Sequence, residues 1–144
     1  TNLKYLNLSG NMMRQEECTN LKKLIVKNQT LEFLDISNCQ IRGSCMSLVL
    51  DSLISNASLQ TLKMADNSFA SKDNLLASKL GRLLQGHPRL LHVDLSRSAL
   101  LRADVIYACW CLRDSPNILS IHLTGNLLGH HDRILIQALL AARI

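Results

Sequence analysis

The sequence predicts a right-handed α/β solenoid segment, in which five parallel strands form one face and helices form the other. A nine-residue pattern, clearest in residues 59–67, has apolar residues at positions 1, 4 and 6 and asparagine at position 9. Because side chains alternate along a strand, positions 4 and 6 point to the same side. The pattern occurs five times, and a helix-length segment follows each copy. Such a periodic strand and helix arrangement is typical of solenoids.

The five copies begin at Leu3, Leu31, Leu59, Leu90 and Ile118. The offsets between them are 28, 28, 31 and 28 residues. Position 9 is occupied by Asn11, Cys39, Asn67, Ser98 and Asn126. A polar side chain there can bond backbone groups that are left free where the chain turns. In such a stack each repeat packs only against its neighbours. The copies span nearly the whole chain, so we expect one domain over residues 1–144.

The two first copies carry a recognisable consensus. Residues 3–11 read L-x-x-L-x-L-x-x-N, and residues 31–39 read L-x-x-L-x-I-x-x-C. Both resemble the leucine-rich repeat family, and the period of about 28 residues resembles its ribonuclease-inhibitor-like subclass. Ser98 departs from the Asn or Cys of the family pattern. The resemblance implies a horseshoe segment with strands on the concave side, helices on the convex side and a role in protein binding.

Composition limits the function classes only in part. The chain has 144 residues, of which 47% are hydrophobic and 3% are aromatic, so Leu and Ile must fill the core. The formal net charge of +5 allows an acidic partner but does not require one. There is no apolar run of membrane-spanning length and no signal peptide.

The cysteines indicate the compartment. Their number is five, which is odd, and their spacing suggests no disulfide framework. Extracellular proteins that resemble this family usually carry cysteine-rich end caps, which this sequence lacks. We therefore expect a reducing, cytoplasmic location. Neither terminal repeat has the polar outer face that a solenoid end needs, so we also expect a fragment of a longer solenoid.

Helical periodicity and stop signals predict a helix after each strand. The expected ranges are 14–27, 44–55, 72–85, 102–113 and the segment that follows residue 132. Ser44 and Asp132 are the expected N-caps of the second and fifth helices. Gly86 and Pro88 should end the third helix. The three extra residues of the third repeat are expected in the turn of residues 70–74.

Each helix should bury one stripe, and one residue after each turn should also point inward. The expected stripes are Cys18, Leu21, Leu24 and Ile25; Val49, Leu50, Leu53 and Ile54; Leu76, Leu80, Leu83 and Leu84; Val105, Ile106, Cys109 and Leu112; Ile134, Leu135, Leu139 and Leu140. The expected inward turn residues are Ile41, Phe69, Leu100 and Leu128. Trp110 lies between two inward positions and should sit at a flank where helices meet.

The candidate binding surface consists of strand positions that face away from the helices. Position 3 gives Tyr5, Phe33, Thr61, His92 and Ser120, and position 5 gives Asn7, Asp35, Lys63, Asp94 and His122. Position 7 is small in every copy, which leaves backbone within reach of a partner. Tyr5 and Phe33 should stand side by side, and exposed aromatic residues often anchor an interface. Alternatively, they stack only on each other and stabilise the sheet.

Charged residues alternate in the position-5 column. Neighbouring strands lie about 4.8 Å apart, so Asp35, Lys63 and Asp94 could pair across them or could recognise a charged partner. A row that satisfies itself would contribute under about 1 kcal/mol per pair. The candidate partner-binding residues are Tyr5, Asn7, Phe33, Asp35, Lys63, His92, Asp94 and His122.

The sequence gives little support for catalysis, a metal or a cofactor. Asp94, His122 and Ser96 resemble a triad only in composition, because they should lie on an open wall without a pocket. His92, Asp94 and His122 on an open sheet would not close a metal shell. Cys109 and Cys111 lack the spacing of a zinc or redox motif, and no glycine-rich phosphate loop is present. We expect neither an enzyme nor a metal or cofactor site.

We therefore expect a scaffold, inhibitor or regulator that binds a protein partner through the concave wall. One alternative is a GTPase-activating module, which would raise GTP hydrolysis by a Ran-like GTPase. Another is a basic convex face that binds nucleic acid or an anionic membrane. The residues of this basic face would be Lys22, Lys23, Lys27, Lys72, Lys79, Arg82, Arg102, Arg113 and Arg133. No nucleic-acid-binding motif accompanies them, so a solvated helical face is the simpler interpretation.

Overall fold

The computed structural model describes residues 2–141 and consists of five strand–helix units. The strands are β1 (Tyr5–Asn7), β2 (Phe33–Asp35), β3 (Thr61–Lys63), β4 (His92–Asp94) and β5 (Ser120–His122). The helices are α1 (Gln15–Lys27), α2 (Gly43–Ser55), α3 (Leu75–Gly86), α4 (Arg102–Arg113) and α5 (His130–Ala141). All neighbouring strands are parallel, in the order β1-β2-β3-β4-β5. The predicted fold class is confirmed.

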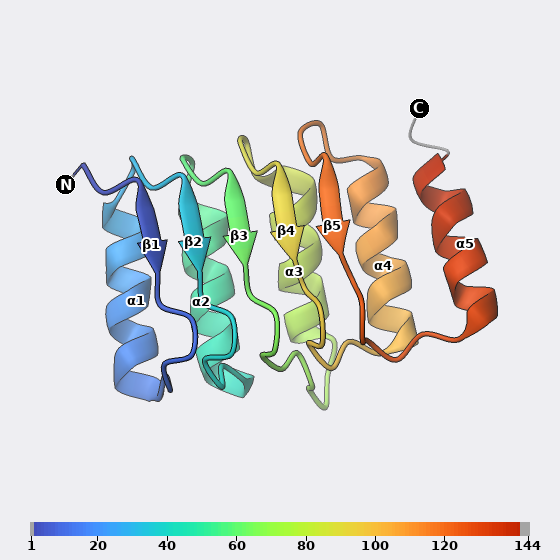
Figure 1. Ribbon diagram of the computed structural model, residues 1–144, viewed down its shortest axis with the longest axis horizontal. Coiled ribbons are helices and arrows are strands. Elements are labelled where there is room, and N and C mark those ends of the chain that lie inside the picture. The colour runs from blue at the N-terminus through green and yellow to red at the C-terminus, as the bar shows by residue number, and fades with distance from the viewer. Residues whose placement is uncertain (1, 142–144) are drawn as a thin grey trace.

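Figure 1 shows the strands side by side in one layer and the helices in a second layer, with β1 and α5 at opposite ends of the row. No element is inserted between sequence neighbours, so each repeat packs on the preceding one. The face of the sheet that points away from the helices is called the strand face below. It corresponds to the expected concave wall.

The core is a strip between the two layers. Positions 1, 4 and 6 of the second, third and fourth copies are at most 1% exposed; these residues are Leu31, Leu34, Ile36, Leu59, Leu62, Met64, Leu90, Val93 and Leu95. The same positions are only partly covered in the first copy, where Leu3 is exposed and Leu6 and Leu8 are half-buried. The interior repeats are therefore covered on both sides, as expected where each repeat contributes to its neighbours' cores.

Helix starts follow the repeat period more closely than they follow local capping signals. Helices α1, α2, α4 and α5 each begin 12 residues after the first residue of their copy. The predicted range of α4 is confirmed, and α1 begins one residue later than predicted. The expected N-cap Ser44 is wrong, because Arg42 takes this place in α2. Asp132 is likewise not the N-cap of α5, since that helix already begins at His130.

Asp132 instead accepts a hydrogen bond from the backbone N–H of Gly129 at 3.0 Å. Glu17 and Asp104 make the equivalent bond to Arg14 and Leu101, at 2.9 and 3.0 Å. An acidic residue in the first helical turn thus satisfies a backbone donor that the helix itself leaves unpaired.

The third repeat departs from the others. Helix α3 begins at Leu75, 16 residues after Leu59, rather than at the predicted residue 72. Residues 70–74 form an irregular loop in place of the first helical turn, so the predicted location of the three extra residues is confirmed.

The inward stripes of the first four helices are largely as predicted, and Met46 and Ala108 are further core residues. Leu24, Ile54 and Ile106 are only half-buried. The stripe of α5 is wrong for Ile134 and Leu135, which are exposed. Leu140 packs against the core as predicted, and Ile136 does so in place of Ile134 and Leu135, because Ile136 and Leu140 lie four residues apart on one helical face. The side chain of Leu139 lies outside the described part of the structure.

The residues at position 9 tie successive turns together. The Asn67 amide nitrogen donates to the carbonyls of Ile36 and Met64, at 2.9 and 3.1 Å, and its oxygen accepts from the N–H groups of Cys39 and Ile41, at 3.2 and 3.0 Å. Asn126 makes the corresponding bonds to the fourth repeat and to Leu123 of its own repeat. Ser98 is fully buried within this regular turn, so the departure from the family consensus does not disturb it.

A second ladder, which the sequence analysis missed, lies at the opposite end of the helices. It contains Asn28, Asn56, His87 and Ser115, each three residues before the first position of the next copy. The Asn56 oxygen accepts the N–H groups of Ser58 and Leu59 at 2.9 Å, and its amide nitrogen donates to the carbonyls of Ile25 and Asn28. These bonds connect a helix end to the following strand and to the preceding repeat.

His87 replaces asparagine in this second ladder. Its Nδ1 accepts the N–H groups of Arg89 and Leu90 at 3.2 and 3.0 Å, so the neutral imidazole with a protonated Nε2 is required. Burial lowers the pKa of His87, and the nearby Asn56 backbone offsets part of this shift. The site therefore favours the uncharged form.

Candidate functional site

The strand face brings together all eight sequence-predicted site residues. The register aligns Tyr5 with Phe33, Thr61, His92 and Ser120 in one column. It aligns Asn7 with Asp35, Lys63, Asp94 and His122 in the next. Since the strands are parallel and in register, residues 28 or 31 positions apart in the sequence become direct neighbours.

Tyr5 and Phe33 form an aromatic pair at the β1 end of the face. Their ring centroids lie 4.2 Å apart, and the ring planes differ by 6°. Phe33 is half-buried, whereas Tyr5 is 60% exposed. The pair thus stacks on itself and still presents one aromatic ring to solvent. The predicted stacking is confirmed, and the role of Tyr5 as an interface anchor stays a prediction.

Lys63 extends the aromatic column instead of joining a ladder of charges. Its Nζ lies 5.7 Å from the centroid of the Phe33 ring, which is within the range of a cation–π contact. The ion pairs within residues 2–141 include none between Lys63 and Asp35 or Asp94. The suggested charge pairing across the strands is therefore wrong.

Three other residues of the position-5 column bend back onto their own turns. One side-chain oxygen of Asn7, Asp35 and Asp94 accepts the backbone N–H two residues later, at 2.9 Å in each case. Asx turns of this kind arise because a short carbonyl side chain reaches the backbone two residues on. They hold the carboxylates of Asp35 and Asp94 in place at the edge of the strand face.

A polar cluster occupies the β5 end of the face. His92 Nδ1 lies 2.7 Å from Ser120 Oγ on the adjacent strand, and His122 is exposed beside Asp94. Ser96 is buried, and its backbone N–H bonds to Asp94. Within residues 2–141, no group of three or more His, Cys, Asp or Glu residues is arranged to hold a metal ion.

A rim contact that the sequence analysis missed borders the strand face at position 8. The Arg97 guanidinium donates to both carboxylate oxygens of Asp66, at 2.7 and 2.8 Å. This bidentate contact lowers the pKa of Asp66 below its usual value. The backbone φ angles at this position are positive in all five copies, between 49° and 78°. Position 8 is thus a left-handed turn residue in every repeat.

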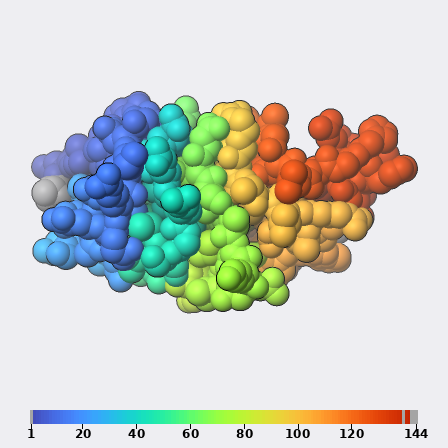
Figure 2. All heavy atoms as spheres, turned by 90° about the horizontal axis from the view of Figure 1, so that it is seen from below, coloured from blue at the N-terminus to red at the C-terminus, as the bar shows by residue number. Residues whose placement is uncertain are grey.

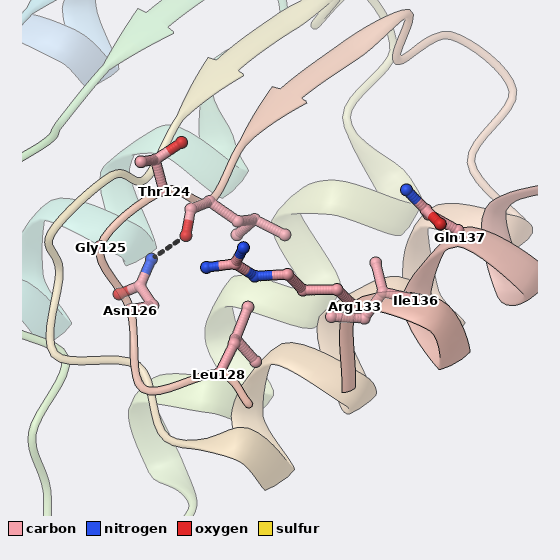
Figure 3. Close-up of a pocket in the computed structure, with 8 residues that line it drawn as sticks. Thr124, Gly125, Asn126, Leu128, Arg133, Ile136 and Gln137 are labelled. Atoms are coloured by element: carbon pink, nitrogen blue, oxygen red, sulfur yellow. Dashed lines mark hydrogen bonds between the residues drawn. The ribbon is translucent and has the colours of Figure 1, made fainter. Parts of the chain in front are cut away.

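Neither Tyr5 nor Phe33 lines any of five cavities formed by the described residues. One of about 350 Å³ lies between the turn after β5 and helix α5, where Figure 3 shows Arg133 reaching across the opening. Its lining residues are Leu123, Thr124, Gly125, Asn126, Leu128, Arg133, Ile136 and Gln137. Asn126 donates a hydrogen bond to the Leu123 carbonyl at 2.9 Å within this site. The strand face itself is an open wall.

Several basic residues of the helical face are occupied by contacts within the protein. Lys79 bonds Asp51 at 2.8 Å and Ser47 at 2.6 Å. Arg102 bonds Asp132, and Arg113 lies 5.2 Å from the Trp110 ring centroid. Trp110 is exposed, and its place at a flank where helices meet stays a prediction. No helix within residues 2–141 has the length and apolar character needed to cross a bilayer.

Comparisons with known proteins identify the class. Leucine-rich repeat profiles match residues 2–24 and 27–47. Together with five regular strand–helix repeats, these matches define the chain as a leucine-rich repeat protein. The recognition made from the consensus pattern is confirmed.

Comparison of the sequence identifies one similar protein, and comparison of the structure identifies two similar folds. The chain is 33% identical over 94 residues to Protein CARMIL of Dictyostelium discoideum, which is 65% of this chain but 8% of that protein. A tropomodulin C-terminal domain from Caenorhabditis elegans superposes with a TM-score of 0.76 at 14% identity, covering 99% of this chain and 85% of that one. Actin-binding site 2 of leiomodin-1 superposes with a TM-score of 0.75 at 12% identity, with coverages of 97% and 80%. At these identities the two structures share the fold with this chain.

Proposed function

We propose that this protein is a non-catalytic module that binds a protein partner through the strand face. The observation that carries the proposal is the exposed Tyr5 ring, which Phe33 supports from one side while Lys63 contacts Phe33 from the next strand. A rigid aromatic group loses little conformational freedom on binding, and aromatic residues dominate interface energies. The fixed carboxylates of Asp35 and Asp94, with Asn7, His92 and His122, would supply polar contacts around this anchor.

Actin is the first partner to test. One superposed structure is described as an actin-binding site of leiomodin-1, and it shares the fold over nearly all of this chain. All five cysteines are free thiols, which supports action in a reducing compartment such as the cytoplasm. Neither argument depends on the aromatic column, so the partner and the site can be tested separately.

The test combines binding to monomeric and filamentous actin with substitution of the anchor. Tyr5→Ala with Phe33→Ala should weaken binding at least about 30-fold, because a lost hot spot costs about 2 kcal/mol or more. Gln85→Ala on the helical face is the matched control and should bind like the unchanged protein. Thermal unfolding would verify that both variants remain folded.

The outcomes separate the two parts of the proposal. Binding that survives the double substitution would refute the aromatic anchor. Absence of any binding to either form of actin would exclude actin. Cross-linking of the unchanged protein and the double variant in cell extract would then test the strand face with its own partners.

A further inference from the structure

The helical face carries a groove at the third repeat. Because residues 70–74 form a loop instead of a first helical turn, α3 starts late and leaves a depression beside the start of α4. Figure 2 shows this green segment standing out from the molecule when the structure is viewed from below. Two cavities of about 300 and 350 Å³ lie here and share the lining residues Asn74, Ala77 and Asp104. They therefore form one continuous groove between α3 and α4.

Both small and large residues line the groove. Ala77, Ser78 and Ala103 line it and have small side chains, so a partner backbone can approach closely. Leu101 and Tyr107, which also line it, are 53% and 44% exposed. A single exposed apolar residue is ordinary, whereas exposed apolar residues that line a groove can contribute to a docking surface.

Tyr107 is held in place at one end of the groove. A Cβ atom placed on Gly81 would lie 2.6 Å from Tyr107 Cε1 and 2.8 Å from Cys111 Sγ. The aromatic ring therefore rests directly on the α3 backbone, where only glycine leaves space. This close approach gives the groove a fixed aromatic wall.

The charge of the groove is negative. Asp73 and Asp104 both line it, whereas Lys72 is its one basic lining residue. One oxygen of each carboxylate accepts a backbone N–H, from Leu75 at 3.0 Å and Leu101 at 3.0 Å. Neither carboxylate joins an ion pair with another described residue of the chain. A cationic side chain with an apolar neighbour would complement both features.

We propose that this groove binds a short amphipathic helix of another protein, with apolar residues facing Tyr107 and Leu101 and a lysine or arginine facing Asp104. A helix suits the site because it can lie along the two helices that form the walls, with its side chains between them. The cavities are large enough for a few side chains of a partner but too small for a folded domain. This groove is separate from the strand face. The helix that it binds is therefore a different ligand from the partner of the strand face.

The experiment uses the full chain and two synthetic helical peptides. The first peptide carries leucine on one face and lysine on the other, and the second has glutamate in place of every lysine. Trp110 is the only tryptophan and lies one turn beyond Tyr107 on α4, so its fluorescence reports docking. The leucine–lysine peptide should bind saturably, and the leucine–glutamate peptide should bind at least tenfold more weakly.

Substitutions locate the binding. Ala103→Phe fills the groove and should reduce affinity for the leucine–lysine peptide at least tenfold, whereas Ala138→Phe on exposed α5 should leave it unchanged. Asp104→Asn keeps an oxygen acceptor for the Leu101 amide but removes the charge, and should reduce affinity about fivefold. The Tyr5→Ala and Phe33→Ala double variant should bind the peptide normally, since the strand face is not involved.

Three results would overturn the proposal. They are absence of saturable peptide binding, equal affinity for the two peptides, and unchanged affinity in both the Ala103→Phe and Asp104→Asn variants. Circular dichroism of each variant would establish that a loss of binding does not come from a loss of structure.

Discussion

At the residue scale, His87 accepts backbone hydrogen bonds at a position where the preceding repeats have asparagine, but it does so with a titratable ring. Asn28 and Asn56 use an amide oxygen to accept backbone N–H groups, and His87 uses Nδ1 for the same purpose. An amide does not titrate near neutral pH, but an imidazole does. Protonation would remove the acceptor from Nδ1 and place a charge in a buried site. The boundary between the third and fourth repeats should therefore be pH-sensitive, whereas the two boundaries before it should not be.

The pKa of His87 is lowered in the folded state, so the unfolded state binds a proton more readily. Stability should be fully present above the ordinary histidine pKa of about 6.5 and should fall as the pH drops from there toward the folded-state pKa. We expect the urea midpoint to decrease between pH 7.5 and 5.5. His87→Asn should remove most of this dependence, and an equally steep decline in that variant would assign it to other groups.

Gly81 is a second residue whose importance only its surroundings reveal. We expect Gly81→Ala to destabilise the protein by about 1–2 kcal/mol, because the added methyl group would overlap Tyr107 and Cys111. Gly86→Ala in the same helix is the control, since a Cβ there meets no atom within 4 Å. Chemical denaturation would compare the two, and equal stabilities would show that Tyr107 moves away without cost.

At the element scale, the turns are fixed by side chains from the next repeat. Asn67 bonds backbone groups of its own turn and of the preceding repeat, while Asn11 bonds only Leu8 and Ser9 within its own turn. The two asparagines occupy the same motif position and differ in burial. An asparagine at position 9 therefore does not contribute equally to stability in every repeat.

Asn67→Ala should cost about 2–4 kcal/mol, because it leaves several buried backbone groups without partners. Asn11→Ala, at the equivalent exposed position, should cost less than about 1 kcal/mol. Thermal and urea unfolding of the two variants would measure the difference. Similar losses would mean that the bonds within one turn matter more than those between repeats.

At the scale of the whole molecule, stability should vary along the stack. Leu8, Ile36 and Met64 each donate the same backbone hydrogen bond to the next repeat, at 2.8, 2.8 and 3.0 Å. Ile36 and Met64 are fully buried, whereas Leu8 is half-buried. Since repeats are stabilised by their neighbours, we expect the interior units of a protein made of residues 1–144 to open less often than its first unit.

Native-state hydrogen exchange tests this expectation directly. The amides of Ile36 and Met64 should be protected at least about tenfold more strongly than that of Leu8. Equal protection at the three amides would indicate that the five repeats unfold as a single cooperative unit.

The repeat period and the apolar pattern by themselves determined the fold, the strand register and the columns of the strand face. They suffice because each repeat buries the same positions against the next, so one pattern fixes every interface. Tertiary structure alone decided which way the longer side chains turn. Lys63 contacts Phe33 rather than Asp35 or Asp94, since those carboxylates are already fixed by their own turns. Tertiary packing also determined the burial of His87 and the groove beside α4, because both depend on contacts between residues far apart in the sequence.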